Sequence, residues 1–367
     1  MQFKGSLYEQ LDGIAGMKFF NVDCHVSVIS DIKNIFSNLG HDVVSWSLSG
    51  HTWIFNESSK NVDIIGGNLW RGLDQEMCDK FYERYKHELD HYDGFIVTYP
   101  TPFALLYEKF NKPIIVQIPI RYEYPFTSSP EKWKWLNEYL TESKNVILIS
   151  NNKYDKSYVR NWIDVDVKYI PSLCEYTNSN YDNRYSEWLL NSRLEFDIDG
   201  TNVFHKKSKL NSGYSWKEFY QYAGLVEFPY CNSTMSIFEQ YTAGFPMIFP
   251  SKELMKELYF EYLDLGQNSI LHEMSFNRLC SMGNKSSLKP KYSDLDPNDF
   301  LSEKTIDNFL NLCDYYDNEW MPAIRHFDNF EELVSMTKTP GTFDNDNRDF
   351  RRDYIYTQRN KILQKLK

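Results

Sequence analysis

The stretch from Leu225 to Pro250, LVEFPYCNSTMSIFEQYTAGFPMIFP, constrains the fold of this chain more than any other segment. It begins with an apolar run that predicts a buried strand. The residues from Asn232 to Thr234 then favour the start of a helix. Gly244 is expected to end that helix, and the residues from Phe245 to Pro250 predict the next strand. Strand, polar turn, helix and strand in this order predict a βαβ unit of a parallel sheet.

The start of this predicted helix is suited to bind an anion. The free backbone N–H groups and the positive end of the helix dipole would point toward an anion bound beyond the end of the preceding strand. Ser233, Thr234 and Ser236 add hydroxyl donors, and Glu239 lies about one turn beyond Ser236 on the same face. This spacing is near the distance from a diphosphate to its ribose, so we expect a nucleotide site in an open parallel sheet.

This layout resembles the C-terminal, nucleotide-sugar-binding half of GT-B glycosyltransferases, in which a Glu lies five residues before the Gly of a Gly-x-Pro. The matching residues here are Glu239, Gly244 and Pro246. The resemblance implies that Glu239 binds the ribose hydroxyls of the donor. Retaining members usually have a second Glu eight positions earlier, where this chain has Cys231, so an inverting reaction is favoured. An ordinary βαβ unit with a polar helix cap is the alternative.

The composition indicates a globular protein of two domains. The chain has 367 residues, of which 42% are hydrophobic and 25% are charged. Its net charge of -11 argues against a nucleic-acid partner, because phosphate backbones need a basic face. Six cysteines without a C-x-x-C pair or a secretory leader predict reduced thiols and a cytoplasmic protein. No apolar run is long enough to predict a membrane span.

Alternating strands and helices predict an α/β fold with two Rossmann-like, doubly wound parallel-sheet domains that face a cleft. The expected domains are residues 1–171 on the acceptor side, residues 172–337 on the nucleotide-sugar side, and a basic helical tail, 338–367, exposed to solvent. Within them we expect a weak strand at 64–65, a loop at 207–215 and a helix at 322–336. Further strands are expected at 17–22, 41–48, 95–99, 113–119, 145–150, 167–172 and 188–193, and further helices at 28–39, 74–91, 103–110, 132–140, 252–262 and 303–311.

Polar residues near the ends of predicted strands supply the candidates for catalysis and binding. Asp23 and His25 follow the first strand, and either side chain could take the proton of an acceptor hydroxyl in an inverting transfer. Arg193 is the expected ligand of the donor phosphates, because a guanidinium makes bidentate bonds to phosphate oxygens. The residues expected to bind the acceptor are Tyr99, Thr101, Arg121 and Glu123.

Two metal motifs compete with this interpretation. The run from His87 to His91 matches H-E-x-x-H, the pattern of a zinc hydrolase, but it lies in a polar segment just before Gly94 and has no recognisable third ligand. Asp-x-Asp pairs hold a divalent ion in metal-dependent glycosyltransferases of the GT-A fold. Such pairs occur at 164/166, 197/199, 294/296 and 344/346, and an acidic chain contains several by chance.

The sequence therefore predicts a glycosyltransferase that moves a sugar from a nucleotide-sugar donor to a hydroxyl of a glycan or other acceptor. The reaction is expected to be inverting and to need neither a metal nor a cofactor, because a helix N-terminus and Arg193 would neutralise the departing diphosphate. The alternatives are a GT-A-like metal-dependent glycosyltransferase, a sugar- or nucleotide-binding protein without turnover, and a zinc hydrolase. The sequence predicts no particular sugar, nucleotide or oligomeric state.

Overall fold

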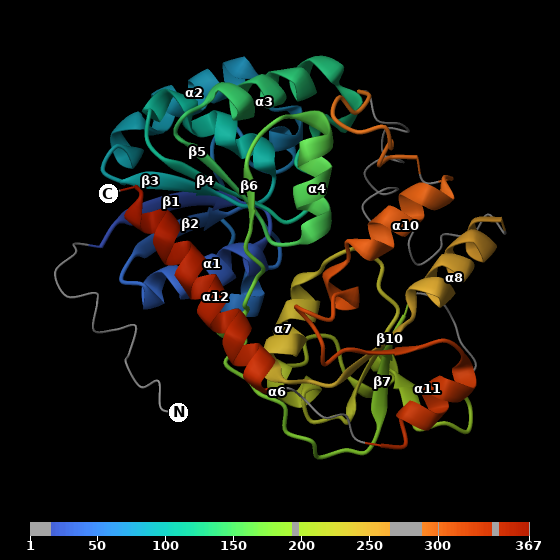
Figure 1. The fold of residues 1–367 in the computed structure, drawn as a ribbon. Helices are drawn as coiled ribbons and strands as arrows, with labels where there is room; N and C mark the ends of the chain where they lie inside the picture. The colour runs from blue at the N-terminus through green and yellow to red at the C-terminus, as the bar shows by residue number, and fades with distance from the viewer. Residues whose placement is uncertain (1–15, 193–197, 265–287, 300, 340–344, 367) are drawn as a thin grey trace.

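Two parallel sheets form the framework of the computed structural model, which describes residues 16–192, 198–264, 288–299, 301–339 and 345–366 (Figure 1). The first sheet has the order β2-β1-β3-β4-β5-β6, and the second has the order β11-β10-β9-β7-β8. Every strand pair in both sheets is parallel. The predicted α/β fold with two parallel sheets is therefore confirmed.

The strands of the first sheet are β1 (Lys18–Asp23), β2 (Asp42–Ser47), β3 (Gly94–Val97), β4 (Ile114–Ile118), β5 (Val146–Ser150) and β6 (Val167–Tyr169). Those of the second sheet are β7 (Trp188–Asn191), β8 (Val203–His205), β9 (Gly224–Glu227), β10 (Met247–Pro250) and β11 (Arg325–Phe327). The chain passes from one sheet to the other between Tyr169 and Trp188. We call residues 16–171 the first half and the described residues from 172 to 339 the second half.

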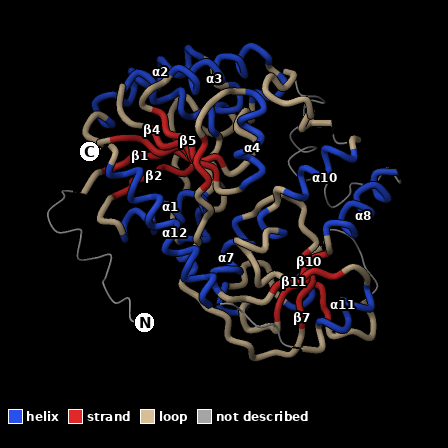
Figure 2. Tube along the Cα trace, in the orientation of Figure 1, coloured by secondary structure: helices blue, strands red, loops and turns tan. Residues whose placement is uncertain are grey.

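Helices surround both sheets (Figure 2). They are α1 (Val26–Asn38), α2 (Gln75–Leu89), α3 (Pro130–Glu142), α4 (Lys153–Trp162), α5 (Lys206–Lys209), α6 (Trp216–Phe219), α7 (Met235–Ala243), α8 (Lys252–Asp264), α10 (Glu303–Asn311), α11 (Phe330–Met336) and α12 (Asn345–Gln364). Short 3-10 helices are η2 (Thr52–Phe55), η3 (Leu69–Gly72), η4 (Thr101–Phe110), η5 (Phe126–Ser128), η6 (Glu175–Thr177) and η8 (Asp314–Tyr316).

Both faces of the first sheet are buried, because successive residues of a strand point to opposite sides. Phe20 belongs to the hydrophobic cluster that includes residues of α2 and α3, whereas its neighbour Phe19 belongs to the cluster that includes α1 and α12. On β3, Phe95 belongs to the same cluster as Phe20, and its neighbour Ile96 belongs to the same cluster as Phe19. Figure 1 shows α2 and α3 above this sheet and α1 and α12 below it. The first half is therefore doubly wound, as predicted.

Strand order reverses at one point in each sheet. In the first, β1 lies between β2 and β3, so the chain turns one way after β1 and the other way after β2. In the second, β7 lies between β8 and β9 in the same manner. The crevice at such a reversal, outside the carboxyl ends of the strands, is where open α/β sheets bind ligands. The strand order therefore predicts two ligand-binding positions, one at the ends of β1 and β3 and the other at the ends of β7 and β9.

Three of the local predictions are wrong. Residues 64–65 lie in turns and not in a strand, and the expected loop at 207–215 contains part of α5. The expected helix at 322–336 is divided into β11 and α11, because Asn329 caps the later helix by accepting from the Glu332 amide at 2.9 Å. The prediction also omitted β8, α4 and α6, which are short or rich in aromatic and polar residues.

The C-terminal tail is helical as predicted, but its expected exposure to solvent is wrong. One side of α12 is buried against the first half through Ile355, Ile362 and Leu363. Two arginines on the same helix are also buried: Arg359 donates to Gln117 of β4, and Arg351 lies 4.7 Å from the ring centroid of Tyr241 on α7. A count of charges along the helix does not reveal that these two arginines are buried.

This packing predicts that Ile355→Ala destabilises the protein. Ile355 is fully buried, so the cavity left by truncation costs about 2–5 kcal/mol. The matched control is Lys361→Ala on the same helix, whose side chain is exposed and whose change is expected to stay within about 0.5 kcal/mol. Urea unfolding of the two variants makes the comparison. An Ile355→Ala variant as stable as the control would show that α12 does not hold the first half together.

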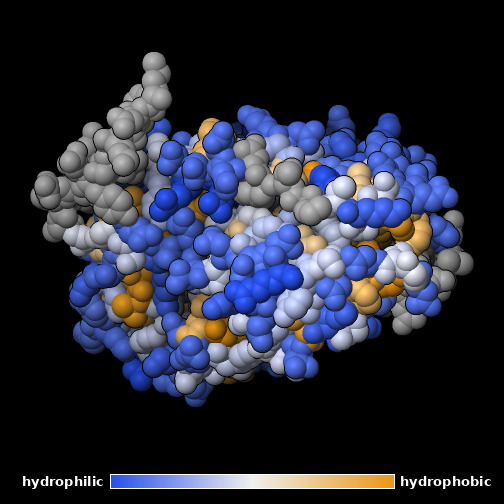
Figure 3. Space-filling model, turned by 90° about the horizontal axis from the view of Figure 1, so that it is seen from below, coloured by the Kyte–Doolittle hydropathy of each residue, from blue (hydrophilic) through white to orange (hydrophobic). Residues whose placement is uncertain are grey.

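No helix among the described residues is long and apolar enough to cross a membrane. Figure 3 shows a mostly hydrophilic face on which apolar side chains form small, separate patches.

Candidate functional site

The reversal point of the first sheet brings together three of the residues predicted from the sequence. Asp23 is the last residue of β1, His25 precedes α1, and Tyr99 follows β3. The amide of Cys24 donates to the carbonyl of Tyr99 at 2.9 Å, which joins the two loops. The rings of His25 and Tyr99 then lie edge to face, with their centroids 6.4 Å apart. The candidates for the catalytic base and an acceptor contact are therefore neighbours.

Asp23 is buried, and its carboxylate accepts hydrogen bonds from nearby groups of the protein. Its Oδ1 accepts from the backbone amide of His25 at 2.8 Å and from the hydroxyl of Ser47 at 3.1 Å. Burial raises the pKa of Asp23 to about 7, although these two bonds lower it. Among the described residues no donor reaches Oδ2. Asp23 thus fixes the backbone from which the His25 side chain projects.

His25 is exposed to solvent at the start of α1. The surrounding protein nevertheless lowers the pKa of its imidazole by desolvation, and His51 lowers it further. An imidazole with a lowered pKa is mostly neutral at pH 7, so it can accept a proton. Of the two predicted catalytic residues, His25 is the one that a substrate can reach directly.

The other candidates for the acceptor side differ in exposure. Tyr99 is half-buried and stacks on Tyr124 with centroids 6.0 Å apart. Thr101 is buried at the first position of η4. Arg121 and Glu123, in the loop after β4, are 2% and 1% exposed. Only Tyr99 presents a side chain to solvent.

At the reversal point of the second sheet, the structure shows a polar pair that the sequence did not suggest. Asn191 at the end of β7 donates to both carboxylate oxygens of Glu227 at the end of β9, each at 2.8 Å. Glu227 lies within an apolar run, which predicts a strand and no polar site. The strand order provides the missing signal, because it places the two strand ends side by side. Arg193, the predicted phosphate ligand, lies outside the described residues.

The start of α7 has the predicted cap. Thr234 is the N-cap residue, and its hydroxyl accepts from the amide of Ile237. The hydroxyls of Thr234 and Ser236 lie 2.8 Å apart, with Ser236 exposed and Ser233 half-buried. Gly244 ends the helix with a φ of 76°, a conformation that favours glycine. The start of α7 therefore presents hydroxyls next to the positive end of its dipole.

Glu239 already has protein partners. Its Oε1 accepts from the Tyr176 hydroxyl at 2.5 Å, and its Oε2 accepts from the Trp216 indole N–H at 3.0 Å. Burial raises the pKa of its carboxyl, whereas both of these bonds lower it. Phe55 of η2 packs on both rings, with centroids 5.3 Å from that of Tyr176 and 6.1 Å from that of Trp216. Glu239 therefore supports an aromatic contact between the two halves, and its role as a ribose ligand stays a prediction.

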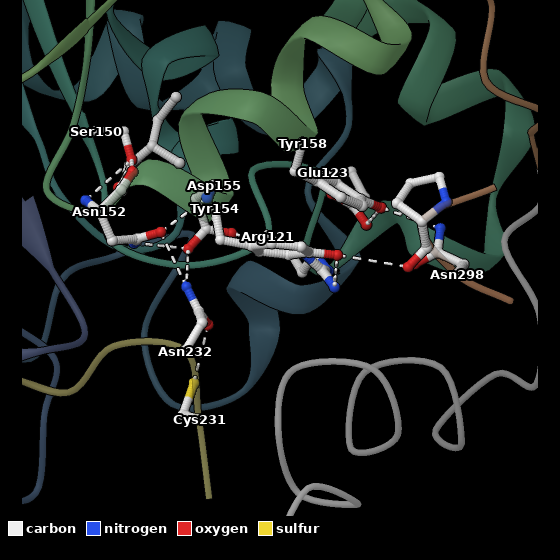
Figure 4. Close-up of polar contacts among 12 residues, drawn as sticks. Arg121, Glu123, Ser150, Asn152, Tyr154, Asp155, Tyr158, Cys231, Asn232 and Asn298 are labelled. Carbon is white, nitrogen blue, oxygen red and sulfur yellow. Dashed lines mark hydrogen bonds and ion pairs between the residues drawn. The ribbon is translucent and has the colours of Figure 1, made fainter. Parts of the chain in front are cut away.

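Arg121 lies at the centre of a buried polar network (Figure 4). Its guanidinium lies 3.7 Å from the carboxylate of Asp155 on α4 and donates to the Tyr154 hydroxyl at 3.1 Å. It also lies over the Tyr158 ring, 3.9 Å from the centroid. Burial disfavours the charge, but these neighbours hold the pKa of Arg121 above its usual range. The charge is compensated within the protein.

The network crosses from the first half to the second. Asn232, which follows β9, donates to Asn152 at 2.9 Å and to Asp155 at 3.2 Å. Asn298, which precedes α10, donates to the Tyr158 hydroxyl at 3.1 Å. Asn152 follows β5 and Asn232 follows β9, so the bond between them joins loops at the carboxyl ends of the two sheets. The two carboxyl edges therefore face one another.

Glu123 gives this network a pH dependence. Its Oε1 accepts from Tyr158 at 2.8 Å, and burial raises the pKa of Glu123 to about 7 although Arg121 lowers it. The folded state thus binds this proton more tightly than the unfolded chain, whose Glu pKa is about 4.3. The resulting stability is complete below pH ~4.3 and is lost as the pH rises through 7.

We therefore predict that Glu123→Gln gains stability relative to wild type as the pH rises from 5 to 8. Glutamine cannot ionise, and one group contributes at most about 1.4 kcal/mol per pH unit in this window. The measurement is the unfolding midpoint of each protein at several pH values. Glu138→Gln is the control, because it removes a carboxylate from the exposed side of α3. A difference between Glu123→Gln and wild type that does not change with pH would contradict the assignment.

Where the structure describes them, the metal motifs form no cluster. α2 ends at Leu89, so His87 and His91 do not lie on consecutive turns of one helix, and both are exposed. Asp166 pairs with Lys168, and Asp296 pairs with Lys289. The pairs 197/199 and 344/346 each include a residue outside the described ranges. Within those ranges no three His, Cys, Asp or Glu side chains are grouped to hold a metal ion.

Comparison with known proteins identifies similar structures but no family. No family model and no curated protein matches the chain. Spinosyn Forosaminyltransferase SpnP is 10% identical, with 88% of this chain and 100% of that chain covered, at a TM-score of 0.37. The glycotransferase of kitacinnamycin is 10% identical, with 96% of this chain and 100% of that chain covered, at a TM-score of 0.43. Spinosyn Rhamnosyltransferase SpnG is 9% identical, with 88% of this chain and 100% of that chain covered, at a TM-score of 0.36. Their names describe enzymes that transfer sugars, and a likeness at these identities and TM-scores assigns neither a family nor an activity to this chain.

Proposed function

We propose that this protein is a glycosyltransferase that moves a sugar from a nucleotide-sugar donor to a hydroxyl of a glycan or other acceptor, with inversion and without a metal. One observation carries the proposal. The carboxyl edges of two parallel sheets face each other, and an exposed histidine lies at the reversal point of the first sheet, while a helix start that carries hydroxyl groups follows a strand of the second.

The second half would bind the donor. Backbone amides at the start of α7, with Ser233, Thr234 and Ser236, supply donors for a diphosphate. Arg193 follows β7 in sequence and would add a cation beside them. Glu239 would accept from the ribose hydroxyls after exchanging its bond to Tyr176 or Trp216. These groups balance the charge of a leaving diphosphate without a metal ion.

The first half would bind the acceptor and supply the base. The acceptor oxygen attacks the anomeric carbon, the bond from that carbon to the diphosphate breaks, and its electron pair leaves with the diphosphate. The neutral His25 imidazole takes the acceptor proton. Asp23 is a positioning residue, because it holds the His25 backbone amide.

Tyr99 would contact the acceptor directly, since it is half-buried and adjoins the His25 ring. Thr101, Arg121 and Glu123 were predicted to contact the acceptor as well. Because all three are buried, we assign them a supporting role in holding the loops after β3 and β4. This replaces the direct contact expected from their place in the sequence.

The proposal predicts metal-independent turnover that depends on His25. His25→Ala should lower turnover by about 10²–10⁴-fold, because the proton then has no positioned acceptor, while donor affinity stays near that of wild type. The measurement is release of nucleoside diphosphate from a panel of nucleotide sugars with excess EDTA. His91→Ala is the control, because it removes an exposed histidine elsewhere on the chain.

Other outcomes select other functions. Activity that EDTA abolishes and manganese or magnesium restores indicates the metal-dependent alternative. Full activity of both His25→Ala and Asp23→Ala indicates a base elsewhere or a retaining reaction. Donor binding without turnover over the full panel indicates a sugar- or nucleotide-binding protein.

A second prediction concerns Glu239. Glu239→Gln keeps the size of the side chain but removes its charge, so nucleoside diphosphate affinity should fall at least tenfold, about 1.4 kcal/mol. Calorimetry with the diphosphate and with its 2′,3′-dideoxy analogue measures the selectivity. Wild type should prefer the natural ribose, and the variant should lose that preference.

Tyr176→Phe is the matched control for Glu239→Gln. It removes one hydrogen bond to the same carboxylate and leaves the charge in place, so ribose selectivity should persist. If wild type binds both ligands equally, or if the two variants lose stability together without a selective loss of ribose recognition, Glu239 only supports the contact between the halves.

A further inference from the structure

A second polar site lies on the side of α4 that faces away from the Arg121 network. It is a pocket of about 590 Å³ between the two halves. Residues of α4, the end of β6, Tyr292 and Leu312 form its walls, and Figure 1 shows α4 and α10 on the same side of the molecule. The lining residues are Lys153, Lys156, Ser157, Arg160, Asn161, Asp164, Tyr169, Tyr292 and Leu312.

The pocket is cationic although the whole protein is acidic. Three cations line it against the single carboxylate of Asp164, whereas the chain has a net charge of -11. Lys153 is paired with Asp317 just outside the lining. Among the described residues no ion pair holds Lys156 or Arg160; their charges lower the pKa of nearby Asp166, which itself pairs with Lys168. Because the net charge of the whole protein is negative, the excess of positive charge in the pocket lining is a local feature.

The positions of these cations on the helix are unfavourable without an anion. Lys153, Lys156 and Arg160 are separated by three and four residues, so they lie along one face of α4. Like charges at such spacings repel each other, and Lys153 and Lys156 also lie at the positive end of the helix dipole. A bound anion would relieve both effects.

The rest of the lining suits a small organic phosphate. Ser157 and Asn161 offer side-chain hydrogen bonds beside the cations, and Tyr169 and Tyr292 add aromatic surface. Backbone amides of Lys291 and Tyr292 donate to the Asn161 carbonyl at 2.8 and 3.0 Å, which ties this wall of the second half to α4. The volume lies within the range of small-molecule sites, roughly 300–1,000 Å³.

We propose that the pocket between α4 and Tyr292 binds a phosphorylated small molecule, with Lys156 and Arg160 as its main phosphate ligands. This site is separate from the start of α7, and it does not depend on glycosyl transfer. A ligand there would contact both halves, so its binding would favour their present arrangement.

The test measures pyrophosphate binding by calorimetry with wild type, Lys156→Gln/Arg160→Gln and a control, Lys134→Gln/Lys361→Gln. The control removes the same charge from exposed positions on α3 and α12. We expect affinity to fall at least ~10-fold in the pocket variant and to change less than ~2-fold in the control. Without ligand, the pocket variant should unfold at or above the wild-type temperature, because it has lost a repulsion.

The same titration in a Thr234→Ala/Ser236→Ala background separates the pocket from the proposed donor site. Pyrophosphate affinity that persists in this background, and falls at least ~10-fold when Lys156→Gln/Arg160→Gln is added to the same background, supports the proposal. Loss of affinity in the α7 background, equal loss in the pocket variant and the charge control, or no binding by wild type overturns it. Nucleoside diphosphates and sugar phosphates as further titrants identify the part of the ligand beyond its phosphate.

Discussion

The buried ion pair between Arg121 and Asp155 lies within the first half and is the centre of the polar network that reaches the second half. Removal of either group would leave the other as an unpaired buried charge, which lowers the free energy of unfolding by about 3–5 kcal/mol. Asp155 also accepts from Asn232, which comes from the second half, and Asn298 reaches the Tyr158 hydroxyl that bonds Glu123. Some of the polar partners around the pair therefore come from the second half.

The two-sheet fold was predictable from local patterns, and its details were not. Apolar runs such as Ile114 to Ile118 are buried on both sides, which is typical of central parallel strands. β8 and β11 have three residues each, too few for a periodic signal, and their pairing depends on neighbours far away in the sequence. α12 shows the opposite problem. Its charges indicated exposure, but Arg351 and Arg359 find buried partners that only the folded chain brings near.

Single elements of the candidate site could be predicted, but their surroundings could not. His25 and Thr234 were identified because they follow strands and precede helices, a relationship that is local in the sequence. Arg121 was also a candidate, but its partners lie on α4, and no local pattern in the sequence indicates that it is buried. The pair of Asn191 and Glu227 becomes visible only with the strand order, because the two residues are joined across β7 and β9. Local chemistry thus selects candidates, and topology decides which of them meet.

The return of α12 to the first half has a consequence for the order in which the chain folds during synthesis. The last strand of the first sheet ends at Tyr169, but Ile355 and Ile362 cover one face of that sheet. The first half therefore emerges from the ribosome with part of its core exposed, and it stays incomplete until the second half has been made. The Arg359 contact with Gln117 joins residues 242 positions apart. Contacts at such a separation slow folding, so this architecture requires the nascent first half to resist aggregation until α12 arrives.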